Sequence, residues 1–241
     1  YPTIAPCDHG AVVFRVTPSK GRAEFACPAH KLALINIDWQ KDFLAAGGFG
    51  SSVGNDVSVL APAVAPASRV LAAARHAQVC VAHTLEAHDP SLDDLSDAKK
   101  LQAPAIGTVA ENGAADVMGR RLVRGEPGNA IVDEMQALDG EVVVHKPGKS
   151  AFYETSLHAE FHKRGISHLV FTGVTTEVCV QTTARAAADR GFMCLIVDDA
   201  TASYNPTFHE VAIEMMTSQN AIVASAASSD AVVAAFEAMS K

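Results

Sequence analysis

The feature that most constrains this chain is a regular alternation of short apolar runs with longer segments of helical periodicity. From residue 31 onward the apolar runs have the length of strands and hold few polar positions, so each would be buried on both faces. The runs lie at residues 32–37, 79–85, 141–145, 168–174, 193–198 and 221–224. The helical segments lie at residues 62–78, 156–164, 176–190, 206–219 and 230–239. This alternation predicts an α/β fold of three layers (α-β-α) around a six-stranded, mostly parallel, Rossmann-like sheet.

The flanks and one long internal segment lie outside this alternation. Residues 1–30 are mixed in character, with one possible strand at residues 12–16, and we expect them to form an N-terminal arm. Residues 31–241 would then form a single domain. Residues 86–128 are rich in Gly and Pro, and a loop of that length in a compact domain usually carries function or short helices.

Composition excludes several classes of protein. Of the 241 residues, 49% are hydrophobic and 19% are charged, which is incompatible with intrinsic disorder. The formal net charge is −8 and no cluster of Lys and Arg is present, so we do not expect nucleic acid as a partner. No run reaches the ~18 uninterrupted apolar residues of a membrane span, so we do not expect a membrane as a partner either.

The five cysteines are too far apart in sequence to form a CxxC motif. An odd number of scattered cysteines in a chain of this size is typical of reduced thiols in a cytoplasmic protein. Most such thiols are small buried hydrophobic groups. Cys179 has a second possibility, because it lies in the first turn of a predicted helix.

Three predicted strands end beside side chains that can do chemistry. Asp38 follows the first strand, Lys146 follows the third, and Cys179 begins the helix after the fourth. Ligands of open parallel sheets bind beyond the carboxyl ends of the strands, so we expect these groups to meet at one edge. The helix start and Lys146 would lower the pKa of the Cys179 thiol. Asp38 would take the thiol proton and return it to a leaving amine, and the N–H groups of Thr175 and Cys179 would form an oxyanion hole.

Taken singly, each of these residues also has an ordinary structural role. An Asp after a strand is commonly a turn former or helix cap, a Lys there is usually solvated, and a Cys in a first helical turn is usually packed. The coincidence of all three at the functional ends of a parallel sheet favours a thiol site.

Three motifs resemble those of a known superfamily. Asp38 in INIDWQKDF, Lys146 in HKPGKSAF and Cys179 in TGVTTEVCV resemble the Asp–Lys–Cys triad of the isochorismatase-like cysteine hydrolases. That superfamily includes nicotinamidases and the amidohydrolases of N-carbamoylsarcosine, ureidoacrylate and biuret, and the resemblance covers residues 31 to about 229. It implies a six-stranded parallel sheet, a cis peptide between Val174 and Thr175, and a dimer or tetramer, with a homotetramer expected. It also implies that a thioester forms on Cys179, that ammonia leaves, and that Asp38 then activates water.

Within the superfamily, several stretches look most like biuret amidohydrolases. They are residues 83–88, 124–128 and 146–149, together with Gln219. This resemblance implies that Phe43, Lys149 and Gln219 bind substrate, with Gln219 hydrogen-bonded to it and Phe43 walling the pocket. The ordinary alternatives are a helix end facing water for Gln219 and core packing for Phe43.

The expected function is therefore a cysteine amidohydrolase, a hydrolase of linear C–N amide bonds. Its small-molecule substrate would be a urea-like or carbamoyl amide, with biuret, converted to allophanate and ammonia, as the first expectation. The alternatives are a ureidoacrylate, triuret or N-carbamoyl amidohydrolase, or a non-catalytic binding protein on the same fold. A redox-sensing thiol is disfavoured because no resolving cysteine lies near Cys179 in sequence.

The resemblance also bears on metals. True isochorismatases often lack the cysteine, so its presence favours cleavage of C–N bonds over ether bonds. Nicotinamidases hold a metal through an Asp-x-His pair and a later His. Glu86-x-His88 imitates that pair, but no His follows until His145, so we expect no metal and no cofactor.

Overall fold

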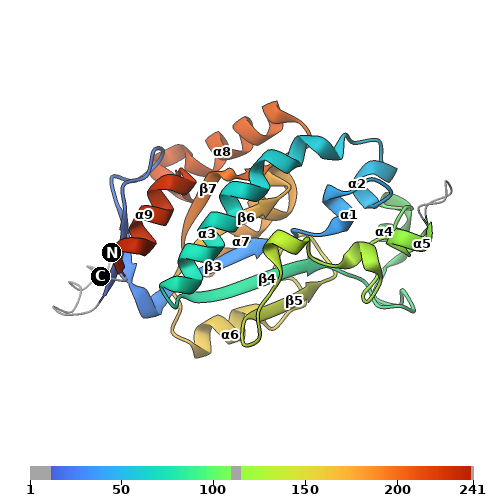
Figure 1. Ribbon diagram of the computed structural model, residues 1–241, viewed down its shortest axis with the longest axis horizontal. Coiled ribbons are helices and arrows are strands. Elements are labelled where there is room, and N and C mark those ends of the chain that lie inside the picture. The colour runs from blue at the N-terminus through green and yellow to red at the C-terminus, as the bar shows by residue number, and fades with distance from the viewer. Residues whose placement is uncertain (1–11, 110–114, 240–241) are drawn as a thin grey trace.

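The computed structural model describes residues 12–109 and 115–239, so the first eleven residues of the predicted arm lie outside it (Figure 1). Its strands are β1 (Val13–Val16), β2 (Phe25–Pro28), β3 (Leu32–Ile37), β4 (Cys80–Glu86), β5 (Val142–Lys146), β6 (His168–Val174), β7 (Met193–Ala202) and β8 (Ser225–Ala227). Its α-helices are α1 (Lys41–Leu44), α2 (Phe49–Ser52), α3 (Val64–His76), α4 (Asp97–Gln102), α5 (Ala115–Met118), α6 (Leu157–Lys163), α7 (Gln181–Asp189), α8 (Pro206–Ala221) and α9 (Ser229–Met239). Shorter turns of 3₁₀ type are η1 (Ala29–Lys31), η2 (Val57–Ala63), η3 (Pro127–Asn129) and η4 (Asp133–Met135), and η5 (Thr176–Val180) is a π turn.

Within the described residues, six strands form one sheet in the order β5-β4-β3-β6-β7-β8, and every neighbouring pair is parallel. The predicted three-layer α/β fold is thereby confirmed. The chain runs outward from β3 through β4 to β5 and then returns to place β6 on the other side of β3. The order of strands reverses beside β3, which is where open α/β sheets form their binding crevices.

The sheet is buried on both faces because alternate residues of its strands pack into different cores. All six residues of β3 are buried. Leu32 and Leu34 belong to the core that α3 and α9 cover, and Ile35 and Ile37 belong to the core that α6 and α7 cover (Figure 1). The continuous apolar run that predicted a strand is therefore explained by two separate apolar layers.

The described part of residues 1–30 forms an antiparallel hairpin of β1 and β2. Phe14 of β1 packs on Phe236 of α9 with ring centroids 4.9 Å apart, and on Phe25 of β2 at 6.2 Å. The strand predicted at residues 12–16 is present, whereas β2 had no counterpart in the sequence analysis.

The last strand lies later than predicted. Residues 221–224 were expected to be a strand, but β8 spans Ser225–Ala227. The reason is a bend near the end of α8: Ser218, Gln219 and Asn220 leave helical φ/ψ, with Gln219, Asn220 and Ala221 at positive φ, so the chain joins the sheet only at Ser225. The loop-rich segment 86–128 contains the short helices α4 and α5.

One helical stretch among the described residues, Val57–His76, is long and apolar enough to cross a membrane by length and composition alone. It consists of η2 followed by α3. Some of its apolar side chains, such as Leu60 and Val70, are fully buried in the core, and 33% of its most apolar window is buried. Arg69 pairs with Asp230 at 2.8 Å on its other side. One side of this stretch therefore packs on the protein core.

Candidate active site

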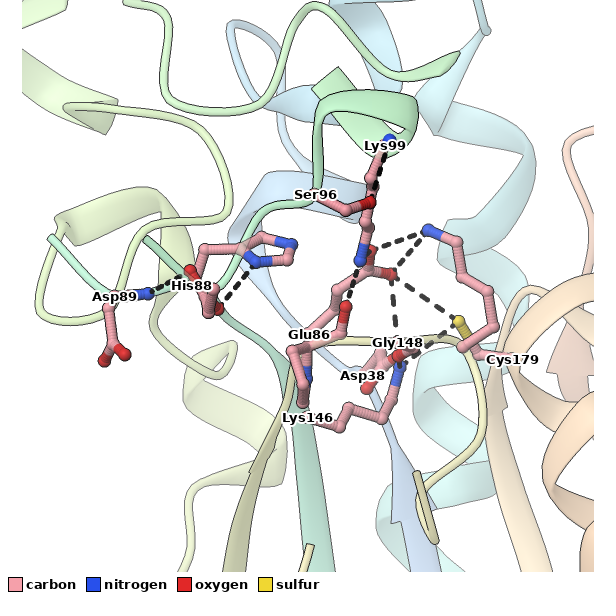
Figure 2. A network of polar contacts seen from close by, with 12 residues as sticks. Asp38, Glu86, His88, Asp89, Ser96, Lys99, Lys146, Gly148 and Cys179 are labelled. Carbon is pink, nitrogen blue, oxygen red and sulfur yellow. Dashed lines mark hydrogen bonds and ion pairs between the residues drawn. The ribbon is translucent and has the colours of Figure 1, made fainter. Parts of the chain in front are cut away.

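The three residues predicted to do chemistry meet at the carboxyl edge of the sheet (Figure 2). The Nζ of Lys146 lies 2.7 Å from Oδ2 of Asp38 and 3.4 Å from Sγ of Cys179. It also donates to the carbonyl oxygen of Gly148 at 3.0 Å. Asp38 and Lys146 are fully buried, and Cys179 is 4% exposed. A carboxylate, an ammonium and a thiol therefore share one small volume.

Two local features position Asp38 and Cys179. One is the backbone and hydrogen bonding of Asp38 after β3, and the other is a glycine in β6. Asp38 has a φ of 52°, and its carboxylate accepts a hydrogen bond from Oγ1 of Thr84 at 2.6 Å. Gly173 has a φ of 140°, and a Cβ there would lie 2.3 Å from the carbonyl oxygen of Ile37. Only glycine fits such a position. It lets the end of β6 pass close to the end of β3, which brings the segment that holds Cys179 to Asp38.

The segment between β6 and α7 carries the predicted oxyanion-hole residues. The peptide bond between Val174 and Thr175 is cis, as expected. The helix predicted over residues 176–190 begins instead as the π turn η5, which contains Cys179. The N–H groups of Val178 and Val180 both donate to the carbonyl of Thr175 at 3.2 Å. Thr175 and Cys179 both line the pocket described below.

Glu86 is a further member of the site that the sequence analysis missed. This fully buried carboxylate accepts from Nζ of Lys149 at 2.7 and 2.8 Å and from the Cys179 thiol at 3.9 Å. Its Oε2 also lies 4.0 Å from Nζ of Lys146. The sequence analysis named Glu86 within the biuret-like stretch 83–88 and as half of an imitated metal pair, and gave it no role in the site. The signal that could have found it is the one that found Lys146, because Glu86 ends β4 and pairs with Lys146 in the sheet register.

A third lysine reaches this cluster from the loop-rich segment. Lys99 on α4 donates to the carbonyl oxygen of Pro147, and its Nζ lies 3.8 Å from Oε1 of Glu86 (Figure 2). Glu86 is thus surrounded by the ammonium groups of Lys99, Lys146 and Lys149.

The charges of the cluster shift its pKa values in opposite directions. Burial alone would raise the pKa of Glu86, but the three lysines outweigh it and hold that pKa below its usual value. Burial alone would lower the pKa of Lys146, but Asp38, Cys179 and Glu86 raise it above its usual value. Both groups are therefore charged at neutral pH.

The thiol behaves differently from the sequence-based expectation. Lys146 does act to lower the pKa of Cys179, but burial dominates and raises that pKa well above its usual value. The expected depression of the thiol pKa is wrong, because water cannot solvate a thiolate at this depth. The resting residue is a neutral thiol that needs a base.

A pocket with a volume of about 440 Å³ opens in front of the thiol. Its lining is Phe43, Phe49, Asn55, Glu86, Lys149, Thr175, Glu177, Val178, Cys179, Tyr204, Asn205 and Phe208. Two of the three predicted substrate-binding residues, Phe43 and Lys149, lie in this wall. Gln219 does not: it is exposed and lies in the bend near the end of α8, where Ser218, Gln219 and Asn220 leave helical φ/ψ. A helix end facing water, the alternative considered for Gln219, matches its place in this chain.

The acidic groups of the site were also tested as metal ligands. Oxygen atoms of Asp38 and Glu86 and the sulfur of Cys179 lie within 4.8 Å of one another. The ammonium groups of Lys146 and Lys149 already neutralise these carboxylates at 2.7 Å, so a cation would have to displace them. His88 bonds to Asp94 at 2.9 Å through its Nδ1.

Known proteins resemble this chain in sequence and in fold. The family model described as "Isochorismatase domain" matches residues 32–228. Ureidoacrylate amidohydrolase RutB of Yersinia enterocolitica is 32% identical over 190 residues, which cover 78% of this chain and 82% of that protein. The Serratia proteamaculans protein of the same name is 31% identical over 205 residues, covering 84% and 82%. The names of both relatives specify ureidoacrylate, and neither specifies biuret.

Solved structures share the architecture. A cysteine hydrolase from Pseudomonas syringae superposes with a TM-score of 0.74 at 20% identity, covering 88% of this chain and 95% of that one. N-carbamoylsarcosine amidase from Thermoplasma acidophilum superposes with a TM-score of 0.61 at 24% identity, covering 83% and 97%. Identities this low establish the fold alone. The family model and the curated relatives go further, and with them the chain belongs to the isochorismatase-like family of cysteine hydrolases.

Proposed function

We propose that this protein hydrolyses a C–N bond of a small amide that carries a ureido group, R–NH–CO–NH₂, by nucleophilic catalysis at Cys179. The observation that carries the proposal is the position of Lys146 Nζ between the Asp38 carboxylate and the Cys179 thiol, at 2.7 and 3.4 Å. The names of two kinds of relative, ureidoacrylate amidohydrolase and N-carbamoylsarcosine amidase, share the ureido unit.

The first half of the reaction transfers the acyl group to sulfur. Asp38 accepts the proton of the neutral Cys179 thiol while Lys146 stabilises the developing thiolate, because the raised thiol pKa leaves little thiolate at rest. The sulfur attacks the carbonyl carbon, and its oxygen takes the negative charge facing the N–H groups of Thr175 and Cys179. Asp38 then gives its proton to the departing nitrogen, so the C–N bond breaks and a thioester remains.

The second half restores the enzyme. Asp38 takes a proton from a water molecule, whose oxygen attacks the thioester carbon. The C–S bond breaks, sulfur recovers the proton, and a carbamic acid leaves. The sum of both halves is the addition of one water to one C–N bond, with no cofactor consumed.

Two substrates are candidates. Ureidoacrylate is favoured by the curated relatives. Biuret is favoured by a different observation, since Glu86 already neutralises the ammonium of Lys149, which lines the pocket. Assembly into dimers or tetramers and a cytoplasmic location remain predictions of the sequence analysis, as does the role of Gln219.

The test is ammonia release from a panel of ureidoacrylate, biuret, triuret and N-carbamoyl amino acids. We expect turnover of at least one compound by the wild-type protein and none by Cys179→Ala. Silence of the wild type on the whole panel would contradict the proposed substrate class. Activity that survives in Cys179→Ala would contradict the proposed nucleophile.

A non-catalytic binding protein is distinguished by trapping. An enzyme of this mechanism, mixed with substrate and quenched in acid, accumulates a mass increase equal to the acyl group on the peptide that contains Cys179. A binding protein releases its ligand unchanged and gains no mass.

A further inference from the structure

We propose that Glu86 sets the charge of the substrate that this site accepts. With the Glu86 carboxylate in place, the site selects ureido compounds whose remaining part is uncharged over those that carry a carboxylate. The proposal rests on the proposed function and goes beyond it, because it names the residue and the chemistry that decide among ureido substrates.

Glu86 is held in one place by its own backbone. Its N–H donates to Oε1 of Gln40 at 2.8 Å, and its carbonyl accepts from Nε2 of Gln40 at 3.1 Å. The same carbonyl accepts from Nδ2 of Asn129 at 2.9 Å. Gln40 and Asn129 are themselves buried. The end of β4 is thus clamped from two loops, which fixes the carboxylate at the pocket wall beside the nucleophile.

The carboxylate removes the charge of the one lysine that lines the pocket in the described part of the chain. Both oxygens of Glu86 accept from Nζ of Lys149, which compensates the charge of that lysine; Lys99 shares the same carboxylate at 3.8 Å but is not among the residues that line the pocket. An ammonium has three donors, and Lys149 keeps the capacity to bond a neutral carbonyl oxygen. It lacks the uncompensated charge that would repay the desolvation of a substrate carboxylate.

The rest of the pocket wall adds to this preference. Glu177 also lines the pocket, and its Oε2 is buried with no hydrogen-bond partner among the described residues. Among the described residues, Lys149 is the one lysine in that lining, and it already bonds both oxygens of Glu86. A substrate carboxylate would meet two acidic groups and one neutralised ammonium. An amide in the same position would offer N–H donors to those acids, which is discrimination by both repulsion and attraction.

The competing explanation is that Glu86 only keeps Lys146 and Lys149 in place. Removing it would then weaken turnover of every substrate by the same factor. A charge-selecting role predicts a change in the preference between two substrates that differ only in charge, which a purely structural role would leave unchanged.

The experiment compares N-carbamoylglycinamide with N-carbamoylglycine, which are matched in size and differ in one terminal amide or carboxylate. We expect the wild-type protein to favour the amide at least tenfold in kcat/KM. In Glu86→Gln the uncompensated Lys149 should lower that ratio at least tenfold, chiefly through a lower KM for the acid. In Lys149→Met, Glu86 loses the one lysine of the described residues that shares the pocket lining with it, and the ratio should rise at least threefold.

Two further variants are controls. One tests whether losing any carboxylate changes the ratio, and the other covers the case in which Glu86→Gln does not fold. Glu141→Gln removes a carboxylate that is held by Arg75 outside the site, and it should leave the ratio within twofold of the wild type. Glu86→Gln/Lys149→Met removes both charges, so it remains informative if Glu86→Gln alone fails to fold. We expect this double variant to discriminate less than threefold between the two compounds.

The outcomes separate this proposal from the proposed function. Equal losses for both compounds in Glu86→Gln, or a wild type that favours the acid, would overturn the charge-selecting role while leaving the enzyme intact. Silence of the wild type on these two compounds counts against the proposed function only together with silence on the whole panel above. Calorimetric binding of the two compounds to Cys179→Ser then still reads the preference, and equal affinities would overturn the role of Glu86.

Discussion

Two glutamates at opposite ends of the central sheet show how the same chemical pairing serves different ends. Glu141 lies just before β5 at the amino edge and accepts from Nε and Nη2 of Arg75 at 2.7 and 2.9 Å. Its Oε2 is also hydrogen-bonded to Nε2 of His83 at 2.8 Å. Glu86 ends β4 at the carboxyl edge and is held by lysines. Both are acids among bases, but only Glu86 lines the pocket beside the thiol.

The type of base accounts for the difference. An arginine presents a rigid planar fork that occupies both oxygens of a carboxylate, whereas a lysine is a point charge with rotatable donors. Oε2 of Glu141 accepts a further bond from the N–H of Leu138 at 2.9 Å, which completes a closed joint. Burial alone would raise the pKa of Glu141, but Arg75 and its other donors lower it to about 2. The contacts of Glu141 with Arg75 use both carboxylate oxygens and stabilise the fold. The lysines around Glu86 keep N–H donors that a substrate could bond.

The largest expected effect comes from Lys146→Met. If the lysine cluster serves only activity and the Arg75–Glu141 pair serves only stability, this variant should lose activity alone, but we expect it to lose both. Turnover should fall at least about 10³-fold because Asp38 and Cys179 lose the cation between them. The variant should also lose about 3–5 kcal/mol of unfolding free energy, since removing one partner leaves a buried charge unpaired. Urea unfolding and ammonia release measure the two losses on the same preparation.

A double variant sharpens that result. Asp38→Asn/Lys146→Met removes both charges and should recover more than half of the lost stability while staying inactive. A double variant as unstable as Lys146→Met would show that the buried ion pair is not the source of the loss.

Glu141→Gln should have the opposite profile. We expect a loss of about 2 kcal/mol in unfolding free energy at pH 7, with turnover per folded molecule within twofold of the wild type. Because the folded-state pKa of Glu141 is about 2 against a usual 4.5, its stabilisation is complete above pH 4.5 and is lost as the pH falls toward 2.

The pH dependence gives the check on Glu141. The stability difference between the wild type and Glu141→Gln should shrink as urea titrations move from pH 5 to pH 3. A difference that stays constant over this range would mean that the ion pair contributes nothing through its charge.

The smallest expected effect belongs to Thr84→Val, which keeps the shape of the side chain and removes its hydroxyl. Oγ1 of Thr84 donates to Oδ1 of Asp38 at 2.6 Å, and a bond to a charged group contributes about 1.5–3 kcal/mol. We expect kcat to fall about tenfold with little change in KM, because the bond orients the base. Thr84→Ser should restore most of kcat, and a Ser variant as slow as Val would argue against the hydroxyl.

Much of the fold could be predicted because each central strand is apolar on both faces, as the six buried residues of β3 illustrate. β2 could not, since Phe25–Pro28 alternates buried and half-buried residues and gains its partner only through the packing of the hairpin. The end of α8 was also beyond sequence reasoning. Its bend depends on positive φ at Gln219, a residue with no intrinsic preference for that conformation.

The triad could be predicted because Asp38, Lys146 and Cys179 each follow a strand of a parallel sheet, where one rule brings strand ends together. Glu86 also ends a strand of the sheet, but its place in the site was overlooked because Glu86 and His88 together suggested a metal-binding pair. The pKa of Cys179 could not be predicted, because its direction depends on how deeply the sulfur is buried once the strands have packed.

The strand order described above has a consequence for the chain as it is being made. On synthesis from the amino end, β3 can pair with β4 along one edge, but its other edge awaits His168–Val174. Until that segment emerges from the ribosome, the most apolar strand of the sheet presents an open edge, the kind of surface that attracts foreign strands. Insertion of β6 both covers that edge and brings Cys179 to Lys146, so protection from misassembly and assembly of the candidate site arrive in a single event.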